Sequence, residues 1–428
     1  MTKRAGAALL LLTAALFLTA NRAAYQGYFQ DDEIDNLSWT RLIPAADYAT
    51  AVLSPRFFTN NFRPVGHFYF REMSLLFGLD FPAYLPLLHL FHLLNVWLVW
   101  SIARQVGLAP LPASLGTLLF AFHMAAFDIY WKPMYAFDLF CATFCLLATL
   151  LYARRRYLLA FCAFWLAYKS KEVAVMLPAV LASYEFLLVE DRNWKRLIPF
   201  FAVSLSFGLQ SILLHPNPDN DYTFRFTPAA FRKCLSFYAS QIFLLPYAGL
   251  TLAALPVFLR DRRLRFGAAL MFLFFMPLLF LPGRLFAAYC YLPLAGLAIM
   301  AGAVASLPRL TPIVAMLCVA WIPWNLAHLR KLRRATLAQD DAVYAYVSEL
   351  EDFAARSKTA HTFVYDGAPD GFHEWGIHGA LQFLYGYPAP ALLPVSDSAA
   401  PAAIASGAVR LVWDPAARKL LVIAFKIP

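Results

Sequence analysis

Long runs of apolar residues, separated by short polar and basic stretches, occupy most of the first 330 residues of this 428-residue chain. A helix that crosses the hydrocarbon core of a bilayer needs about 20 mostly apolar residues. The candidate stretches are 5–23, 83–103, 108–127, 134–153, 157–169, 173–189, 196–214, 235–259, 266–282, 286–306 and 309–326. The first could be a cleaved signal peptide, but we interpret it as an uncleaved span because many spans follow. The pattern therefore predicts an α-helical polytopic membrane protein with about eleven transmembrane helices.

The composition supports a membrane protein. The chain is 61% hydrophobic and only 14% charged, whereas a soluble domain is about half apolar and a quarter charged. A net charge of +10 would in another protein suggest binding to nucleic acid. Here the basic residues form short clusters between apolar runs, as expected of cytoplasmic loops. We therefore exclude nucleic acid as a partner and use the charge to predict the topology.

Basic clusters that follow alternate spans set the orientation. They contain Lys3 and Arg4, Arg104, residues 154–156, Arg192, Lys195 and Arg196, residues 260–265, and Arg309. With the N-terminus inside, all of them lie on the cytoplasmic side, as the positive-inside rule requires. The connection 24–82 and the turns near Asp128 and Lys171 then lie outside. The basic cluster 329–334 violates this topology, and it marks either the start of a soluble helix or a span count that is off by one.

The last part of the chain has soluble character. Residues 340–357 have the periodicity of an amphipathic helix, and residues 361–367 resemble a strand that enters a turn. A β-hairpin is predicted over 409–425, with Asp414 and Pro415 at its turn, and 388–403 is predicted to be a loop. Two domains follow from this: a transmembrane domain at 1–330, including the outer loop 24–82, and a small soluble α+β domain at 331–428 on the outer face.

Charged residues gather in the first outer connection. The segment QDDEIDN (30–36) places four acidic side chains within five positions, and such side chains repel one another unless something uses them. The run is either a solvated loop beside the membrane or the source of a general base or metal ligand. In the same connection, Arg63 precedes Pro64. It is either an interfacial anchor or a guanidinium that binds phosphate through two hydrogen bonds.

Further charges stand at the predicted outer ends of later spans. Lys171 and Glu172 interrupt an apolar run, and since a charge at the bilayer centre costs about 3 kcal/mol, such residues usually face a cavity or a partner. Arg284 precedes Tyr289 and Tyr291; it is a snorkelling anchor or another phosphate contact. His123 and Asp138 also fall at this side, although no histidine spacing of the HExxH type occurs. The topology derived from the basic loops thus brings acids and cations to one surface.

Six motifs along the chain resemble motifs of the GT-C superfamily of membrane glycosyltransferases and occur in the same order. The resemblance covers about residues 25–300 and is greatest to the protein O-mannosyltransferases of the transmembrane-and-tetratricopeptide-repeat type and their bacterial relatives. The motifs are the pair Asp31 and Asp32, FRPVGHFYF, PLLHLFHLLNVWLV, LFAFH with the later Asp138, YKSKEVAVMLPAVL, and AAYCYLPLAGLA. The C-terminus departs from the family because the repeats are absent, which leaves the acceptor open.

The resemblance implies a hexosyl or mannosyl transfer from a polyprenyl-phosphate-linked donor to a hydroxyl of a protein, lipid or glycan. This reaction is expected on the periplasmic side of a bacterial inner membrane. By their position in the motif, Asp31 is expected to be the base and Asp32 its partner. The residues expected to bind the donor phosphate are Lys171 and Arg284, with Arg63 as an alternate; those expected to position the substrates are Glu172, His123, Asp138 and Tyr291. Relatives differ in metal dependence, so a divalent metal stays open.

A transporter or flippase for a lipid-linked or anionic substrate is the alternative function. It would also combine many spans with charged residues. Transporters commonly contain paired repeats with broken helices near the midplane of the membrane. No such halves are visible in this sequence, and the charges stand at the outer ends of the spans.

Overall fold

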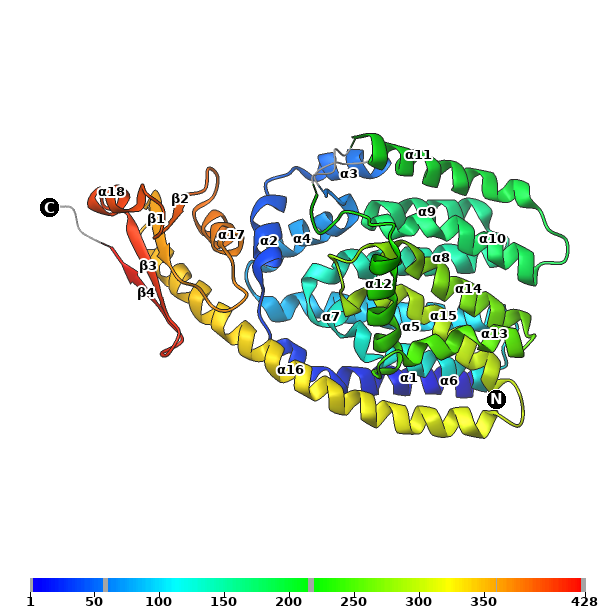
Figure 1. Cartoon of the computed structure of the whole chain (residues 1–428). Helices are drawn as coiled ribbons and strands as arrows, with labels where there is room; N and C mark the ends of the chain where they lie inside the picture. The colour runs from blue at the N-terminus through cyan, green and yellow to red at the C-terminus, as the bar shows by residue number, and fades with distance from the viewer. Residues whose placement is uncertain (1–2, 57–60, 215–218, 359, 425–428) are drawn as a thin grey trace.

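The computed structural model describes residues 3–56, 61–214, 219–358 and 360–424, without the side chains of 3–10 and 212. Residues 57–60 of the predicted outer connection lie outside this range, as do the side chains of Lys3 and Arg4. Long helices run side by side, and a unit with a β-sheet lies beyond one end of them (Figure 1). The fold is therefore a helical body with a C-terminal unit (residues 360–424) attached.

The helical body is built from α-helices joined by short 3-10 turns. The α-helices are α1 (Lys3–Ala20), α2 (Asp31–Thr40), α3 (Ala45–Leu53), α4 (Pro64–Phe77), α5 (Leu85–Gln105), α6 (Pro110–Ala121), α7 (Phe127–Trp131), α8 (Ala136–Ala153), α9 (Tyr157–Ser170), α10 (Leu177–Leu188), α11 (Ile198–Leu214), α12 (Pro228–Phe243), α13 (Leu255–Phe258), α14 (Arg262–Phe275), α15 (Tyr291–Ala305) and α16 (Thr311–Arg356). The 3-10 turns are η1 (Arg22–Gln26), η2 (Phe81–Tyr84), η3 (Met124–Ala126), η4 (Pro133–Tyr135), η5 (Glu172–Met176), η6 (Trp194–Leu197), η7 (Ala248–Ala253), η8 (Met276–Phe280) and η9 (Ala287–Cys290).

Fewer helices are long enough to span a membrane than the eleven that the sequence predicts. Among the described residues, five helices are long and apolar enough to cross a membrane, or up to seven if two bent pairs each form one span. The bent pairs are α6 with α7, at 51°, and α12 with α13, at 88°. Helices α9 and α10 contain 14 and 12 residues, so at about 1.5 Å per residue neither alone crosses a core about 30 Å thick. The count of eleven is not confirmed.

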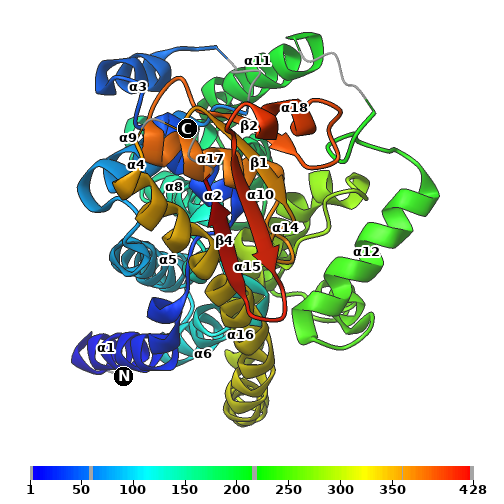
Figure 2. The ribbon, with the colours of Figure 1, turned by 90° about the vertical axis from the view of Figure 1, so that its left-hand side faces the viewer.

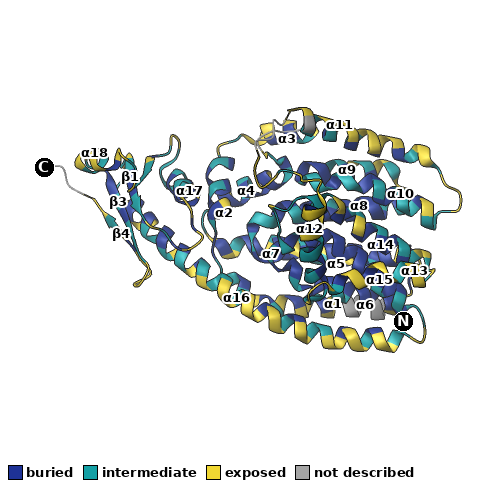
Figure 3. Ribbon diagram, in the orientation of Figure 1, coloured by how far each residue is buried: buried dark blue, intermediate teal, exposed yellow. Residues whose placement is uncertain are grey.

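Small residues let the central helices approach closely. A Cβ atom at Gly267 of α14 would come 2.8 Å from the carbonyl oxygen of Gly296 on α15. A larger side chain at position 267 would therefore force the two helices apart. Such interfaces are common in membranes, where close van der Waals packing replaces the hydrophobic effect. In Figure 3 the central helices α5, α8 and α15 are buried, whereas α11 and α16 expose side chains. On α16 these include Met316, Leu317 and Val319, which suit contact with lipid.

The two ends of the helical body carry different charged residues. The N-terminus, α13 and the connection from α10 to α11 lie at one end, whereas α2, α4 and α17 lie at the other (Figure 1). The first end therefore carries basic residues that the sequence predicts to be cytoplasmic, such as Arg192 and Arg260. The opposite end carries α2, which begins at Asp31. This arrangement agrees with the predicted separation of basic loops from the acidic run.

Helix α16 joins the helical body to the C-terminal unit. It has 46 residues, a length of about 69 Å at 1.5 Å per residue, and it continues past the other helices to the sheet (Figure 1). The basic cluster 329–334 lies within it. Arg333 donates a hydrogen bond to Asn21 Oδ1 at 2.8 Å and stands over the Trp131 ring at 5.1 Å. Neither explanation of this cluster is tested. The cluster lies near the middle of one continuous helix, which also contains the boundary predicted at residue 330.

The C-terminal unit is a four-stranded mixed sheet with two helices. Its elements are β1 (Thr362–Asp366), α17 (Glu374–Tyr385), β2 (Ala391–Pro394), α18 (Ala400–Ala405), β3 (Val409–Asp414) and β4 (Lys419–Ile423), in the sheet order β2-β1-β3-β4. The predicted strand and the predicted hairpin are confirmed, since β3 and β4 pair antiparallel. The prediction that 388–403 is a loop is wrong: it contains β2 and α18. Strand β2 forms by parallel pairing with β1, a contact that no local pattern specifies.

Candidate active site

Helix α2 presents the acidic run at its first turn. Asp31, Asp32 and Glu33 all fall there, where the partial positive charge of a helix N-terminus favours carboxylates. Glu33 forms a capping box by accepting from the Gln30 backbone N–H at 2.7 Å, and it also accepts from the Met134 N–H at 2.9 Å. Burial raises the pKa of Glu33 to about 8, although both N–H groups oppose the shift. Glu33 thus fixes the start of α2 and is not available to a substrate.

Asp31 is covered by the C-terminal unit. Its Oδ1 accepts from the His373 backbone N–H at 2.7 Å, and its Oδ2 contacts the ring Nδ1 of the same residue. His373 is the N-cap of α17, so the N-terminus of that helix points at the carboxylate. Burial raises the pKa of Asp31, and the His373 contacts oppose the increase. Both carboxylate oxygens of Asp31 are therefore engaged.

Asp32 is exposed and contacts Trp375, which lies two residues after His373. Its Oδ1 accepts from the indole Nε1 of Trp375 at 3.1 Å. The Trp375 ring stacks on the His373 ring, with the centroids 4.4 Å apart and the planes 1° from parallel. Adjacent acids of α2 thus meet two aromatic residues of α17.

Glycines explain how α17 comes so close to α2. A Cβ atom at Gly379 would lie 2.8 Å from the Asp35 Cα and 2.9 Å from its backbone nitrogen. A Cβ atom at Gly376 would collide with Asp31 Oδ1 and with the Phe372 ring. Figure 2 shows α17 directly in front of α2 when the C-terminal unit faces the viewer. The segment GFHEWGIHG (371–379) is therefore shaped to dock on the acidic run.

A second group of charges lies at the same end of the body. We define the outer cluster as Asp138, Lys171, Arg284 and Tyr289. The Lys171 ammonium donates to both oxygens of Asp138, at 2.7 and 2.6 Å, and stands over the Tyr289 ring at 4.5 Å. Lys171 and Asp138 are both largely buried. Lys171 and Asp138 thus form a fixed ion pair at the edge of the helical body.

Arg284 joins the outer cluster through Tyr289. Its guanidinium interacts with the Tyr289 hydroxyl and lies within electrostatic range of Asp32. It packs between the rings of Tyr222 and Phe286, at 4.4 and 4.6 Å. Its Nε is buried and has no hydrogen-bond partner in the described part of the chain. A buried donor without a partner is costly, and an incoming oxyanion would satisfy it.

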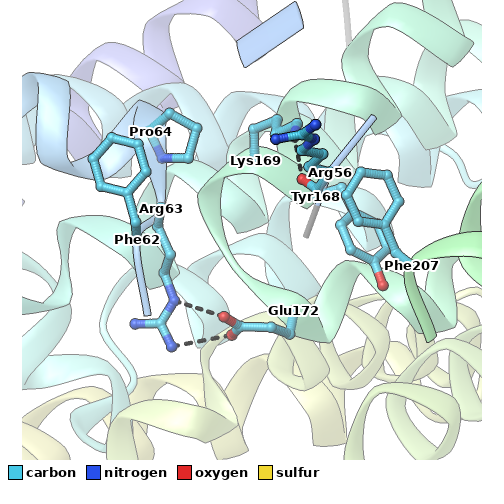
Figure 4. A pocket seen from close by; sticks show the side chains of 8 residues that line it. All are labelled: Arg56, Phe62, Arg63, Pro64, Tyr168, Lys169, Glu172 and Phe207. Atoms are coloured by element: carbon cyan, nitrogen blue, oxygen red, sulfur yellow. Dashed lines mark hydrogen bonds and ion pairs between the residues drawn. The ribbon is translucent and has the colours of Figure 1, made fainter. Parts of the chain in front are cut away.

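Arg63 and Glu172 form a bidentate ion pair beside this cluster. The Arg63 Nε and Nη2 donate to the two Glu172 oxygens at 2.9 and 3.1 Å (Figure 4). Burial alone would raise the pKa of Glu172, but the Arg63 guanidinium outweighs burial and holds the pKa below its usual range. A cavity of about 20 Å³ adjoins the pair, with Lys169 and Arg56 on its wall. Arg63 thus has a partner of its own, unlike Arg284 Nε.

Two residues predicted to position substrates have other contacts. His123 is buried, and its ring nitrogens bond to backbone atoms: Nε2 to the Ile242 carbonyl oxygen at 2.8 Å and Nδ1 to the Ala125 N–H at 3.2 Å. The Tyr291 hydroxyl lies between His92 and Asn95, at 2.9 and 3.1 Å. Among the contacts described, none joins His123 or Tyr291 to the outer cluster. Both residues tie helices together.

The structure adds Tyr289 and the start of α17 to the residues that the sequence pointed to. Tyr289, rather than Tyr291, contacts Lys171 and Arg284, and His373 and Trp375 contact the two acids. The available signal was the density of His, Trp and Gly in 371–379. Within the described ranges, no group of three or more His, Cys, Asp or Glu side chains is placed to hold a metal ion, and metal dependence stays open.

Comparison with solved structures identifies a shared fold. The structure of ArnT from Cupriavidus metallidurans bound to undecaprenyl phosphate aligns with 99% of this chain and 98% of its own, with a TM-score of 0.54 and 14% identity. The chain therefore shares the overall fold of this ArnT structure. The structure of the arabinofuranosyltransferase AftD from mycobacteria aligns with 92% of this chain and 32% of its own, at 14% identity and a TM-score of 0.49.

No family model and no curated protein matches this sequence. The prediction of a helical integral membrane protein is supported by the apolar helices and by the fold shared with ArnT. The narrower resemblance to protein O-mannosyltransferases is not shown.

Proposed function

We propose that the chain transfers a monosaccharide from a polyprenyl-phosphate-linked donor to a hydroxyl acceptor. The observation that carries the proposal is the arrangement of Lys171 and Arg284, which share Tyr289 and lie at the end of the body that presents Asp32. The fold shared with ArnT, whose structure contains undecaprenyl phosphate, supports a donor of this class. We place the reaction on the periplasmic side of a bacterial inner membrane, with a hexose such as mannose as the sugar, because of the predicted topology and the family resemblance.

The chemistry needs a base and a cation. The acceptor oxygen attacks the anomeric carbon, the bond from that carbon to the phosphate oxygen breaks, and polyprenyl phosphate leaves. The acceptor proton passes to a carboxylate of α2, a contribution of about 10² to 10⁴ in rate for a well-placed base. Lys171 and Arg284 stabilise the charge that develops on the departing phosphate. The unpaired Nε of Arg284 supports a phosphate oxygen at this position.

The contacts favour Asp32 as the base. The motif alone points to Asp31, but both of its oxygens accept from His373. Asp32 is exposed and accepts one hydrogen bond, from Trp375. We therefore propose that Asp32 takes the proton while Asp31 holds α17 in place. Glu172 then orients Arg63, and Asp138 orients Lys171.

The test is transfer by purified protein in lipid nanodiscs. Synthetic polyprenyl-phosphate mannose and glucose are supplied with membrane extract as the acceptor source, and labelled product is separated from labelled lipid. We expect transfer by the wild type, at least about 10²-fold less by Asp32→Asn, and an unchanged rate for Asp47→Asn, an exposed acid of the same outer connection. Uptake of substrate into proteoliposomes without any covalent product would instead support the transporter.

A further inference from the structure

A cavity at the start of α17 adjoins Trp375, the residue that bonds to Asp32. It has a volume of about 390 Å³ and is lined by Glu374, Trp375, His378 and Leu392. Three of these residues come from the first turns of α17 and the fourth from β2. This cavity is widely open to solvent, so a ligand would rest on its wall and not be enclosed. Because Trp375 both lines the cavity and bonds to Asp32, a ligand in the cavity would lie next to that acid.

The wall of the cavity is a flat aromatic surface. The Trp375 side chain is 49% exposed, yet it is held in place, because its N–H bonds to Asp32 and its ring lies parallel to that of His373. An exposed tryptophan that is fixed on both sides loses little conformational freedom when a ligand stacks on it. Trp375 therefore presents an exposed ring that is already held in one orientation, as a binding surface requires.

Polar groups surround this surface. Glu374 accepts a hydrogen bond from the Tyr365 hydroxyl at 3.1 Å, which fixes the carboxylate at the edge of the cavity. His378 adds an imidazole, which can donate or accept, and Leu392 adds one apolar side chain. The lining is thus one flat ring with donors and acceptors around it.

This combination fits a sugar better than the other acceptor classes. A pyranose ring presents C–H bonds on its faces and hydroxyls around its edge, so it can stack on an indole while its hydroxyls bond to carboxylate and imidazole. A lipid chain would need a mostly apolar lining. A phosphate would be repelled by Glu374 and Asp32, since no lysine or arginine lines the cavity.

We propose that this cavity binds the acceptor, and that the acceptor is a saccharide stacked on Trp375 with one hydroxyl directed at Asp32. The inference rests on the proposed function and names its acceptor class. During transfer, that hydroxyl oxygen bonds to the anomeric carbon of the donor sugar, its proton passes to Asp32, and polyprenyl phosphate leaves. The C-terminal unit therefore selects the acceptor, whereas the outer cluster binds the donor.

The experiment measures sugar binding without catalysis. Full-length protein in nanodiscs is mixed with methyl hexopyranosides and their β1,4-linked disaccharides, or with a Ser/Thr-rich peptide, and saturation-transfer NMR reports binding. We expect binding of at least one saccharide, a loss of about tenfold in Trp375→Ala, and less than about threefold in Trp375→Phe, which keeps a flat ring. Trp194→Ala is the matched control, since Trp194 is also 49% exposed but lies in η6.

The outcomes separate this inference from the proposed function. Binding of the peptide alone, or saccharide binding that Trp375→Ala leaves unchanged, overturns the acceptor site. Undecaprenyl phosphate binding is measured in the same samples. If the saccharide binds through Trp375 but the wild type neither binds undecaprenyl phosphate nor transfers sugar, the saccharide site stands and its role as an acceptor site in a transferase is overturned.

Discussion

Replacement of Gly379 by alanine tests whether docking of α17 on α2 matters for function. The added Cβ would lie 2.8 and 2.9 Å from the Cα and nitrogen of Asp35, closer than an ordinary van der Waals contact. Both are backbone atoms, so no side-chain rotation relieves the clash, and α17 has to shift by several tenths of an ångström. The shift would lengthen the hydrogen bonds between His373 and Asp31.

Two opposing effects set the change in the free energy of docking in Gly379→Ala. Overpacking costs about 1 to 3 kcal/mol, whereas alanine is about 1 kcal/mol more favourable than glycine within a helix. We expect a net loss of about 1 kcal/mol in docking, or about a fivefold change in the docking equilibrium. Gly208→Ala is the control, because a Cβ at Gly208 of α11 meets nothing within 4 Å; there only the favourable effect remains.

Hydrogen exchange measures the docking of α17 on α2, and the transfer rate measures the effect of docking on catalysis. Peptides that cover α2 and the start of α17 should exchange about fivefold faster in Gly379→Ala, because local opening sets the exchange rate. Transfer should fall by a similar factor if docking holds Trp375 beside Asp32. The reasoning is refuted if Gly379→Ala matches Gly208→Ala in both measurements.

Three other variants test the charged residues. Arg284→Ala should weaken undecaprenyl phosphate binding in nanodiscs about 10- to 100-fold, the value of a charged hydrogen bond, while Arg260→Ala at the opposite end should not; equal affinities would contradict the donor site. Asp138→Asn should lower the melting temperature, since loss of one partner leaves the largely buried Lys171 unpaired at a cost of about 3 kcal/mol; an unchanged value would contradict this. Between pH 5 and 8, folded Glu33, with a pKa of about 8 against 4.5 unfolded, keeps a proton that the unfolded chain releases, so stability falls as pH rises. Glu33→Gln should melt with less pH dependence, and an identical slope would refute the protonated state.

Much of the outer cluster could be predicted from the sequence. The positions of the basic loops place Lys171, Asp138 and Arg284 at one end, and hydropathy alone finds α5, α8, α14 and α15. Tyr289 and Tyr291 differ in their contacts for a geometric reason. Tyr289 lies in the 3-10 turn η9 and Tyr291 begins α15, so the two side chains do not share one helix face. With α15 beginning at Tyr291, that residue faces the helices of the body.

The contact of Asp31 with His373 could not be predicted in this way. The two residues are 342 positions apart, and their meeting depends on the close approach that Gly376 and Gly379 allow. A pair of glycines in a helix has no periodic pattern that identifies its partner. The same limit applies to β2, whose strand character comes from pairing with β1 rather than from alternation of its side chains.

The unbroken length of α16 sets the height of the C-terminal unit above the bilayer. One helix thus carries exposed apolar side chains in its first part and leads to the sheet at its end. A bilayer thickness that tilts α16 would therefore also change how α17 contacts α2.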